Sequence, residues 1–358
     1  MLANQQVSVE LNSTTDNPLV DASSNHIRHG GNFQAASLTS AMEKARLGLS
    51  MVAKLLFAQT TEIMNPAMNR GLTPNLCADD PSVSFMGKGI DITMAAYYSE
   101  IAFLSNPVST HVQSAEMHNQ SVNSLALVSA RYTLEVAEIL SMMSASYLFM
   151  VCQALDLRVL QVRFLSTARA RVTESTGAIL TQLAKESVID SSKISNVIWN
   201  SLAKEWDGTT TLDLTQRAQK TAEVAAAHLM RELQQSVSLD CSVSELFRAI
   251  DTWTSTLAET IRSVYGAERE EMFSRHREIT PKYLGQGSSV LYTFVRENLD
   301  VPFHRGLVDD PTYVLQDGAI PSVPPQQRQT IGSQISRICD AISTGALHRP
   351  LIASVTQA

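Results

Sequence analysis

The sequence predicts an all-α protein in which long helices form an antiparallel bundle core with an added helical layer. Apolar residues recur at steps of three and four through two long stretches of the 358-residue chain, the spacing of one helix face. Apolar residues make up 44% of the chain and charged residues 18%, proportions typical of a protein with a packed core. No segment of convincing length alternates with the period of a strand. Long helices joined by short loops favour an antiparallel bundle.

The first stripe predicts a helix over residues 38–63, with one polar interruption at Gln59. Its apolar positions are expected in the core, and they are Leu38, Met42, Ala45, Leu49, Val52, Leu56 and Ile63. A second and longer stripe follows steps of 3-4-4-3-4-4-3, close to the turn of an α-helix. It comprises Leu125, Val128, Tyr132, Val136, Ile139, Met143, Tyr147 and Met150. Both stripes predict core helices.

Two further features extend the helical prediction. A shorter helix is expected over about residues 92–104, ending before Asn106-Pro107 because proline disfavours helix in the residue before it. The uncharged run of residues 139–155 contains three serines and Gln153, whose polar groups would be costly in lipid. This run is therefore predicted to be a buried core helix rather than a membrane span.

Changes in amino-acid composition divide the chain into three predicted segments. Residues 1–157 form the central bundle with the loops that carry polar motifs. Residues 158–297 carry more charge and all three tryptophans, and they are expected to form the additional helical layer. Residues 298–358 are rich in proline up to about residue 326 and then form a last helix over about 330–343, which Gly345 ends.

Charge and cysteine content limit the classes of partner. The 28 basic and 35 acidic residues give a formal charge of −7, which offers no attraction for a phosphate backbone, so nucleic acid is not expected as a partner. The four cysteines are far apart in the sequence and form no CxxC pair, which argues against a zinc site and fits a reducing compartment. The first residues lack the basic and apolar regions of a signal peptide. We expect a soluble, cytoplasmic protein with no membrane partner.

Two polar motifs interrupt the apolar first half. Asn12-Ser13-Thr14-Thr15-Asp16-Asn17-Pro18 favours a tight turn closed by its own side chains, or simply a loop between two elements. His29-Gly30-Gly31-Asn32-Phe33-Gln34 stands directly before the first stripe. Paired glycines permit close approach of the backbone, and a helix start offers N–H donors to an anion, although the same residues also suit an ordinary capped turn.

The third motif is a set of amides around one carboxylate. Gln113, Glu116, Gln120 and Asn123 are spaced 3-4-3, with Asn119 beside them, which on a helix would form one polar stripe. Residues 105–130 contain no Lys or Arg, whereas a solvated helix face usually carries cations. An internal polar site is therefore favoured over a solvated face, and buried amides would each need a partner.

Other motifs do not indicate chemistry. Gly87-Lys88-Gly89 lacks the third glycine and the preceding strand of a dinucleotide-binding loop. His111 and His118 lie seven residues apart, which is not the spacing of a helical metal-ligand pair. No serine lies in a nucleophile elbow. A metal enzyme and a hydrolase are therefore disfavoured.

The three polar motifs, in this order, resemble the aromatic amino-acid ammonia-lyase family, most closely its fungal and plant phenylalanine ammonia-lyases. The resemblance is continuous over about residues 8–158 and looser beyond. The segments that carry it are NSTTDNPLVD, HGGNFQAAS, MEKARLGLSMVAKLLFAQTTEIMN, MNRGLTPNL, DPSVSFMGKGIDITMAAYYSEIAFLSNPVSTHVQSAEMHNQSVNSLALVSAR and CQALDLR. It implies the helical fold of the ammonia-lyase and fumarase superfamily, with residues 158–297 as a shielding-type layer.

The resemblance also implies a substrate-binding set, which comprises Asn17, Phe33, Lys88, Glu116, Asn119 and Gln120. Asn17 matches the asparagine of the family's DNP turn, which contacts substrate across subunits. Phe33 matches the aromatic residue that lines the pocket, and Lys88 a lysine near the substrate carboxylate. Glu116 and Asn119 match the carboxylate and the amide beside the amino group and the cofactor.

One departure from the family is large. The family's electrophile, 4-methylidene-imidazol-5-one, forms from an Ala-Ser-Gly tripeptide, and no Ala-Ser-Gly occurs in these 358 residues. The catalytic tyrosine and the arginine that binds the substrate carboxylate also belong to the amino-terminal half, so the chain resembles only the carboxyl-terminal half and no catalytic residue is expected in it. The implied activity is conversion of L-phenylalanine to trans-cinnamate and ammonia by a homotetramer, with this chain inactive alone. The alternatives are an inactive oligomerising remnant and a 2,3-aminomutase.

Overall fold

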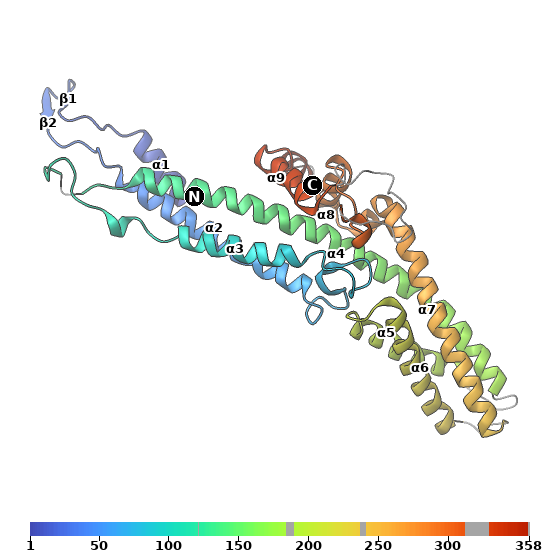
Figure 1. Cartoon of the computed structure of the whole chain (residues 1–358). Coiled ribbons are helices and arrows are strands. Elements are labelled where there is room, and N and C mark those ends of the chain that lie inside the picture. Colours follow the sequence, from blue (N-terminus) through green and yellow to red (C-terminus); the bar gives the residue numbers. More distant parts are fainter. Residues whose placement is uncertain (121, 184–189, 237–240, 312–328, 357–358) are drawn as a thin grey trace. The chain divides into compact units, whose positions relative to one another are not determined.

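The computed structural model describes residues 1–120, 122–183, 190–236, 241–311 and 329–356 (Figure 1). The helices and strands are α1 (Leu2–Leu11), β1 (Leu19–Asp21), β2 (His26–Arg28), α2 (Ala36–Met64), α3 (Lys88–Leu104), α4 (Ala126–Leu183), α5 (Ser191–Gly208), α6 (Leu214–Ser236), α7 (Val243–Ile279), α8 (Gln286–Thr293), α9 (Ile331–Ser343) and α10 (His348–Thr356). The predicted all-α class is confirmed, and β1 and β2 add only a short antiparallel hairpin.

The chain forms two compact units. Unit 1 comprises Met1–Gln59 and Asp91–Tyr147, and unit 2 comprises Thr60–Ile90 and Leu148–Ala358. The long helices α2, α3 and α4 each contribute to both units. These boundaries do not coincide with the three segments expected from the sequence, and that division stays a prediction.

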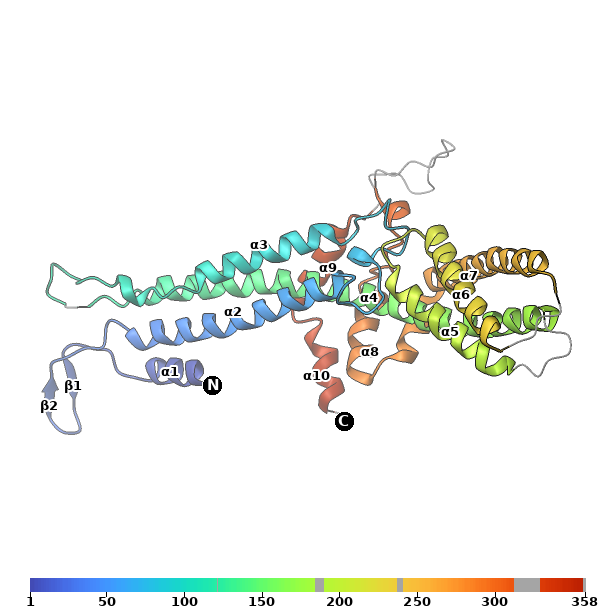
Figure 2. The same cartoon turned by 90° about the horizontal axis from the view of Figure 1, so that it is seen from below.

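In unit 1, α3 runs in the opposite direction to α2 and α4, as Figures 1 and 2 show. The ring of Phe57 on α2 stacks on Tyr98 of α3, while Glu43 on α2 accepts from the backbone N–H of Val108 beyond the end of α3. Because the earlier residue of α2 meets the later residue of the α3 segment, these helices are antiparallel. Thr39 and Arg46 meet successive parts of the α4 segment, so α4 runs parallel to α2.

A buried arginine joins α2 to α4 in unit 1. Arg46 is fully buried, and its guanidinium donates to the carbonyl oxygen of Ser129 at 2.6 Å, to the Ser129 hydroxyl at 2.9 Å and to the Thr133 hydroxyl at 3.2 Å. Burial lowers the pKa of Arg46, and the carboxylate of Glu43 acts in the opposite direction. Buried polar groups of this kind fix one register between two helices, because any shift leaves a charge without partners.

The predicted helix at residues 38–63 is confirmed, but its core face was placed one position away from where it lies. The fully buried positions of α2 include Thr39, Arg46 and Ala53, at a spacing of seven. The predicted core residues Leu38 and Ala45 are only half-buried, and Val52 is 48% exposed, so its predicted place in the core was wrong. The apolar side chains of Leu47 and Met51 are exposed as well. Two faces of α2 carry residues at the same helical repeat, one buried and one apolar but exposed. Periodicity alone could therefore not show which of the two faces is buried.

The second predicted stripe holds better, since α4 buries Val136, Ile139, Met143 and Met150. Within the described part of the chain, α4 is long and apolar enough to cross a membrane by length and composition, with a mean hydropathy of 1.4 in its most apolar window. Of that window, 39% is buried inside the protein. The core helix of a soluble protein passes the same test of length and composition. The prediction of a core helix rather than a membrane span is therefore retained.

In unit 2, α5, α6 and α7 pack in sequence order, and the later part of α4 joins them. The ring of Phe164 on α4 contacts Trp206 of α5 and Tyr265 of α7, at centroid distances of 4.5 and 5.4 Å. The guanidinium of Arg217 on α6 lies 3.8 Å from the Trp206 ring centroid. Burial lowers the pKa of Arg217 to about 10. This aromatic cluster is the core of the unit, because it contacts all four helices.

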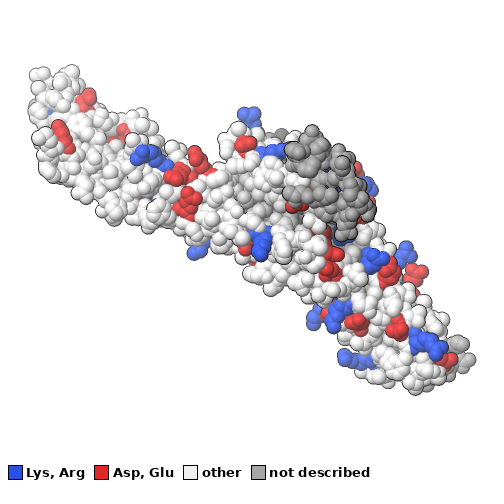
Figure 3. All heavy atoms as spheres, viewed as in Figure 1, with Lys and Arg blue, Asp and Glu red and all other residues white. Residues whose placement is uncertain are grey.

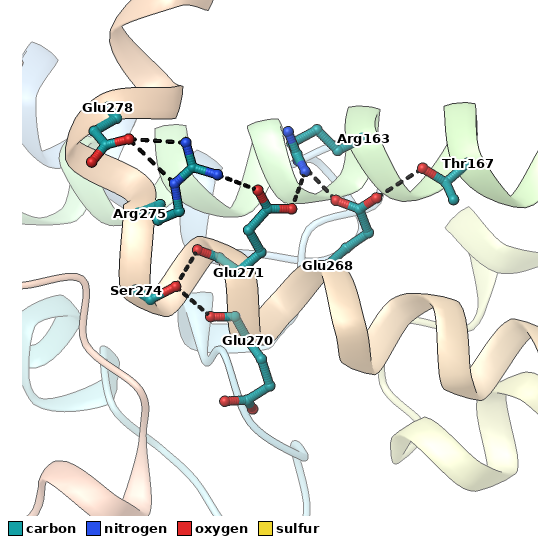
Figure 4. Close-up of polar contacts among 8 residues, drawn as sticks. All are labelled: Arg163, Thr167, Glu268, Glu270, Glu271, Ser274, Arg275 and Glu278. Carbon is teal, nitrogen blue, oxygen red and sulfur yellow. Dashed lines mark hydrogen bonds and ion pairs between the residues drawn. The ribbon is translucent and has the colours of Figure 1, made fainter.

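An ion-pair network connects α4 to α7 at the surface of the same unit (Figure 4). Arg163 on α4 donates to Glu268 at 2.8 Å and to Glu271 at 2.5 Å. Glu271 also accepts from Arg275, which pairs in turn with Glu278. Exposed pairs contribute little one by one, but a network with a bidentate arginine fixes the angle between two helices more firmly.

A second ion pair of unit 2 is completely buried. Arg296 donates to Asp156 at 2.6 Å, and both side chains have no exposed surface. The hydroxyls of Thr280, at 2.7 Å, and Tyr292 also donate to the Asp156 carboxylate. Burial is the strongest influence and acts to lower the pKa of Arg296, but Asp156 together with Cys152 and Tyr292 outweighs it, so the pKa is raised. Asp156 therefore ties α4 to α8 and to the single π-helical turn at Phe294–Asn298.

The ends of several helices confirm local predictions. Helix α3 ends at Leu104, before Asn106-Pro107, although it begins four residues earlier than expected. Thr330 caps α9, and Gly345 follows its end with φ of +74°. Helix α7 begins with a capping box of Ser242 and Glu245, which was not predicted above. Pro321, Pro324 and Pro325, which predicted a loop, lie outside the described residues.

Candidate functional site

The three polar motifs of the sequence meet at one set of loops in unit 1. The Oδ1 atom of Asn17 accepts from the backbone N–H of Gly30 at 3.3 Å. Gln34 donates from Nε2 to Oε1 of Gln120, and Gln120 donates from its own Nε2 to a carboxylate oxygen of Glu116 at 3.1 Å. We call these five residues the loop site. All of them belong to unit 1, so their relative positions are those of one compact unit.

The hairpin of β1 and β2 brings the first two motifs together. Leu19 pairs with Arg28 and Asp21 with His26, so the residues just outside the pair, Asn17 and Gly30, also face one another. The turn is closed by Asp21, whose carboxylate accepts from the Ser23 and Ser24 hydroxyls at 2.7 and 2.5 Å. Hydrogen bonds from Ser24 and then Ser23 lower the pKa of Asp21 to about 2.

The local structure explains why glycine occupies both positions of the pair. Gly30 has φ of +141°, a conformation that other residues rarely adopt. At Gly31, an added Cβ would lie 2.4 Å from the ring of Phe33, so only glycine allows that ring to fold back on the backbone. Phe33 itself remains 52% exposed. The loop therefore presents an aromatic surface to solvent at the loop site.

Helix α1 supplies an anchor for this loop. The carboxylate of Glu10 accepts from the Asn32 amide at 2.7 Å and from the Ser37 hydroxyl at the start of α2. Lys44 on α2 donates to Gln6 at 3.0 Å. Since α1 buries none of its residues, these polar contacts rather than apolar packing connect it to α2.

The expected helix at residues 113–123 was wrong, and so was the internal placement of its polar stripe. Ala115 pairs with Gln120 in an isolated antiparallel bridge, and the chain turns sharply between them. In unit 1, Glu116 and Asn119 are exposed and Gln120 is half-buried. A stripe made only of polar residues gives a helix no apolar face to bury, and Asn123 instead accepts from the Leu125 N–H just before α4 begins.

The turn is strained where it carries the carboxylate. Glu116, Met117 and His118 have φ of +49°, +51° and +66°, three left-handed residues in succession and none of them glycine. Each such residue costs about 1–2 kcal/mol, so the turn stores roughly 3–6 kcal/mol of strain. Two bridge hydrogen bonds between Ala115 and Gln120, at 2.9 and 3.1 Å, oppose it. The backbone N–H of Asn119 also donates to the carbonyl oxygen of Glu116 at 2.8 Å.

Lys88, another predicted site residue, belongs to unit 2, whereas the loop site belongs to unit 1. It is the first residue of α3, and its ammonium lies 5.2 Å from the ring centroid of Phe85. The backbone of Gly87 next to it is held close to Asn75 and Met150, where a Cβ would lie 2.6 Å from each. The glycine thus fixes the start of α3, and with it the lysine.

The groups gathered at the loop site can bind a small polar molecule. The Glu116 carboxylate can accept from an ammonium group, while the amides of Asn17, Gln34 and Gln120 offer donors and acceptors, and Phe33 offers an apolar surface. Such a set suits an amino acid with an aromatic side chain. Among the described residues, no cluster of His, Cys, Asp or Glu side chains could hold a metal ion.

Comparison with known proteins identifies the family. The family profile described as "Aromatic amino acid lyase" matches residues 1–180, half of the chain. The chain belongs to this family. Among curated relatives, the phenylalanine ammonia-lyase lenB of Aspergillus lentulus is 44% identical over 96% of this chain and 47% of its own length. The phenylalanine aminomutase of Talaromyces islandicus is 39% identical over 99% of this chain and 48% of its own length.

A solved structure agrees with the assignment of this lyase-family chain. The crystal structure of phenylalanine ammonia-lyase from Rhodosporidium toruloides superimposes with a TM-score of 0.87 and is 37% identical, covering 98% of this chain and 51% of that chain. The lyase-family chain spans about half the length of the curated relatives it matches. The resemblance stated from the sequence is therefore confirmed at the level of family and fold.

The predicted site residues fall into three groups. Asn17, Glu116 and Gln120 are joined into the loop site with Gly30 and Gln34, as described above. Phe33 and Asn119 lie on the same loops and have no side-chain hydrogen bond to another described residue, and Lys88 is in the other unit. Two contributing residues were not predicted from the sequence: Gln34, although it stands in the HGGNFQ motif, and Glu10. No local pattern pointed to Glu10, because its partners lie 22 and 27 residues away.

Proposed function

We propose that this chain is the substrate-binding half of an aromatic amino-acid ammonia-lyase that converts L-phenylalanine to trans-cinnamate and ammonia. The observation that carries the proposal is the hydrogen-bonded series Gln34–Gln120–Glu116, which joins the exposed turn of the carboxylate to the loop that carries the Phe33 ring. Membership in the aromatic amino acid lyase family and the names of its relatives support the substrate class.

The site residues predicted from the sequence then have proposed tasks. Glu116 accepts from the substrate ammonium group, and Gln120 fixes the orientation of that carboxylate. Phe33 contacts the aromatic ring, and Asn17 offers an amide to the substrate. Lys88 lies in unit 2, outside the loop site, and the family resemblance matches it with a lysine near the substrate carboxylate.

The family's electrophile does not fit this chain by itself. Its precursor is an Ala-Ser-Gly tripeptide, which these 358 residues lack, and the loop site supplies only carboxylate and amide groups. No catalytic step can therefore be assigned to residues of this chain. We expect the purified chain to bind an aromatic amino acid at most, and to release no cinnamate.

A related aminomutase is the second candidate function. The aminomutase of Talaromyces islandicus matches nearly the whole chain at 39% identity, close to the values for the ammonia-lyases. A lyase would release cinnamate as the main product from L-phenylalanine, whereas an aminomutase would give β-phenylalanine. A catalytically inactive remnant that only oligomerises would give neither product under any condition.

We also propose that the chain assembles as a homotetramer in the cytoplasm. Leu47, Met51 and Leu55 form an exposed apolar row on α2, with Met51 76% exposed. On the face drawn in Figure 3, few charged side chains interrupt the surface over α2 and α3, in contrast to the region of α5, α6 and α7. Apolar rows of this kind favour association. Size exclusion with light scattering should show an oligomer, and M51E should shift it toward a 39.2 kDa monomer.

The test of function uses absorbance of cinnamate with L-phenylalanine as substrate. The chain is assayed alone and together with the amino-terminal half of an intact relative, added as a separate polypeptide. We expect turnover only in the second case. Turnover by the chain alone would overturn the assignment of an inactive half, and no product of either kind in the second case would favour the inactive remnant.

A point variant tests the role of Glu116 in the active mixture. Glu116→Gln retains the shape of the side chain but removes its charge, so we expect kcat/KM to fall about ten- to hundredfold, the value of a charged hydrogen bond. Glu100→Gln on α3 is the matched control, since Glu100 is exposed and outside the loop site. Equal activity of the two variants would contradict the proposed role.

A further inference from the structure

A serine and a histidine join across the strained turn that carries Glu116. The hydroxyl of Ser114 lies 2.5 Å from Nδ1 of His118, and the two residues enclose Glu116 and Met117. With the ring proton on Nε2, the Ser114 hydroxyl donates to Nδ1. The pair is not the start of a hydrolytic triad, because no carboxylate among the described residues accepts a hydrogen bond from His118.

Burial does not hold this turn in place. Met117 at its tip is 97% exposed, and Ser114, Glu116 and His118 are exposed as well. The turn therefore lacks the apolar contacts that fix most strained backbone segments. Hydrogen bonds must hold it, and two of them join side chains across the turn, Ser114–His118 and Glu116–Gln120.

The residue types suit this task. Histidine tolerates positive φ better than most residues, and its Nδ1 atom lies close enough to the backbone to reach four residues back. Ser114 has a short side chain whose hydroxyl can meet that nitrogen. Opening of this bond would free the backbone at Glu116 and separate its carboxylate from the Gln120 amide, which lies 3.1 Å away.

We propose that Ser114 and His118 are positioning residues for Glu116: their hydrogen bond keeps the turn in its left-handed conformation and so holds the carboxylate against Gln120. The inference rests on the proposed function, because the position of Glu116 matters for activity only if Glu116 binds the substrate. It assigns no contact with substrate to Ser114 or His118. Its physical part, the coupling between the pair and the turn, holds independently of any activity.

The first experiment measures the turn directly in the full chain by NMR. Hydrogen exchange is followed at the bridge amides of Ala115 and Gln120, together with the short HN–Hα distance that marks positive φ at Glu116. We expect S114A to raise exchange at both amides about three- to tenfold, the effect of one lost hydrogen bond, and to weaken the positive-φ signal. S99A on α3 is the matched control, because it removes an exposed serine hydroxyl that bonds only within its own helix.

A set of variants separates the hydrogen bond from general loss of structure. H118A should act like S114A, and the double variant should add little to either, since both remove the same bond. H118N should restore slow exchange, because asparagine tolerates positive φ and places a polar atom where Nδ1 lies. Unchanged exchange in S114A, or failure of H118N to restore it, would overturn the proposal.

The second experiment uses the active mixture of the two halves. S114A should raise KM for L-phenylalanine severalfold while leaving the thermal midpoint of the chain at the value of S99A, a split that a purely structural role would not produce. If the mixture shows no activity, the proposed function fails while the exchange experiment still decides the role of the pair. Activity of S114A equal to that of S99A, with faster exchange, would show that the turn does not position Glu116.

Discussion

The buried ion pair of Asp156 and Arg296 offers a test of what stabilises unit 2. Asp156→Asn keeps the volume of the side chain and one oxygen acceptor for Thr280 and Tyr292, but it leaves the guanidinium of Arg296 buried without a counter-charge. Removing one partner of a fully buried pair costs about 3–5 kcal/mol. We therefore expect the free energy of unfolding of unit 2 to fall by that amount.

Tryptophan fluorescence reports this unit alone. All three tryptophans, Trp199, Trp206 and Trp253, lie in unit 2, and each is buried. With a urea dependence of about 3 kcal/mol per molar, a loss of about 3–5 kcal/mol lowers the urea midpoint by roughly 1–2 M. Far-UV circular dichroism of the same samples should confirm that the helices of the variant form before urea is added.

A matched surface pair provides the control. Glu259 and Arg262 form an ion pair at 2.7 Å on α7, but their side chains are 62% and 47% exposed. Glu259→Gln should shift the midpoint by no more than a few tenths of a molar, because exposed pairs contribute at most about 1 kcal/mol. A shift in Asp156→Asn as small as that of the control would refute the reasoning. The double variant D156N/R296M should lose less than the sum of the single variants, since no lone charge remains.

Two further predictions concern groups buried in unit 2. Burial lowers the pKa of His276 and His304, so the unfolded chain binds protons at a higher pH than the folded chain does. The contribution of these histidines to the free energy of unfolding is therefore complete above about pH 6.5, and it is lost as the pH falls through the folded-state pKa values. In H276Q/H304Q, the urea midpoint should depend less on pH between 7.5 and 5.5, and an unchanged slope would contradict this assignment. Burial also raises the pKa of Cys77 and Cys152 to about 12, so iodoacetamide at pH 8 should modify neither thiol until urea unfolds the chain. Peptide mass spectrometry measures this, and early modification of either thiol would show that its surroundings open in the native state.

Much of the helical framework was predictable from the sequence. The long stripes located α2 and α4, the Asn106-Pro107 step located the end of α3, and Thr330 and Gly345 marked the limits of α9. These signals are local, because a helix face, a cap and a proline each act within about one helical turn. The family motifs added the members of the site but not their arrangement.

The tertiary structure alone decided which groups meet. The sequence suggested a buried polar helix around Glu116, whereas the chain forms an exposed, strained turn there. Gln120 of this turn accepts a hydrogen bond from Gln34, which lies 86 residues away in the sequence. It likewise gave no sign that Asp156 would meet Arg296, 140 residues away. Periodicity and propensity describe neighbours along the chain. Contacts between distant polar groups follow instead from how helices pack, and burial then makes each unpaired charge too costly to leave without its partner.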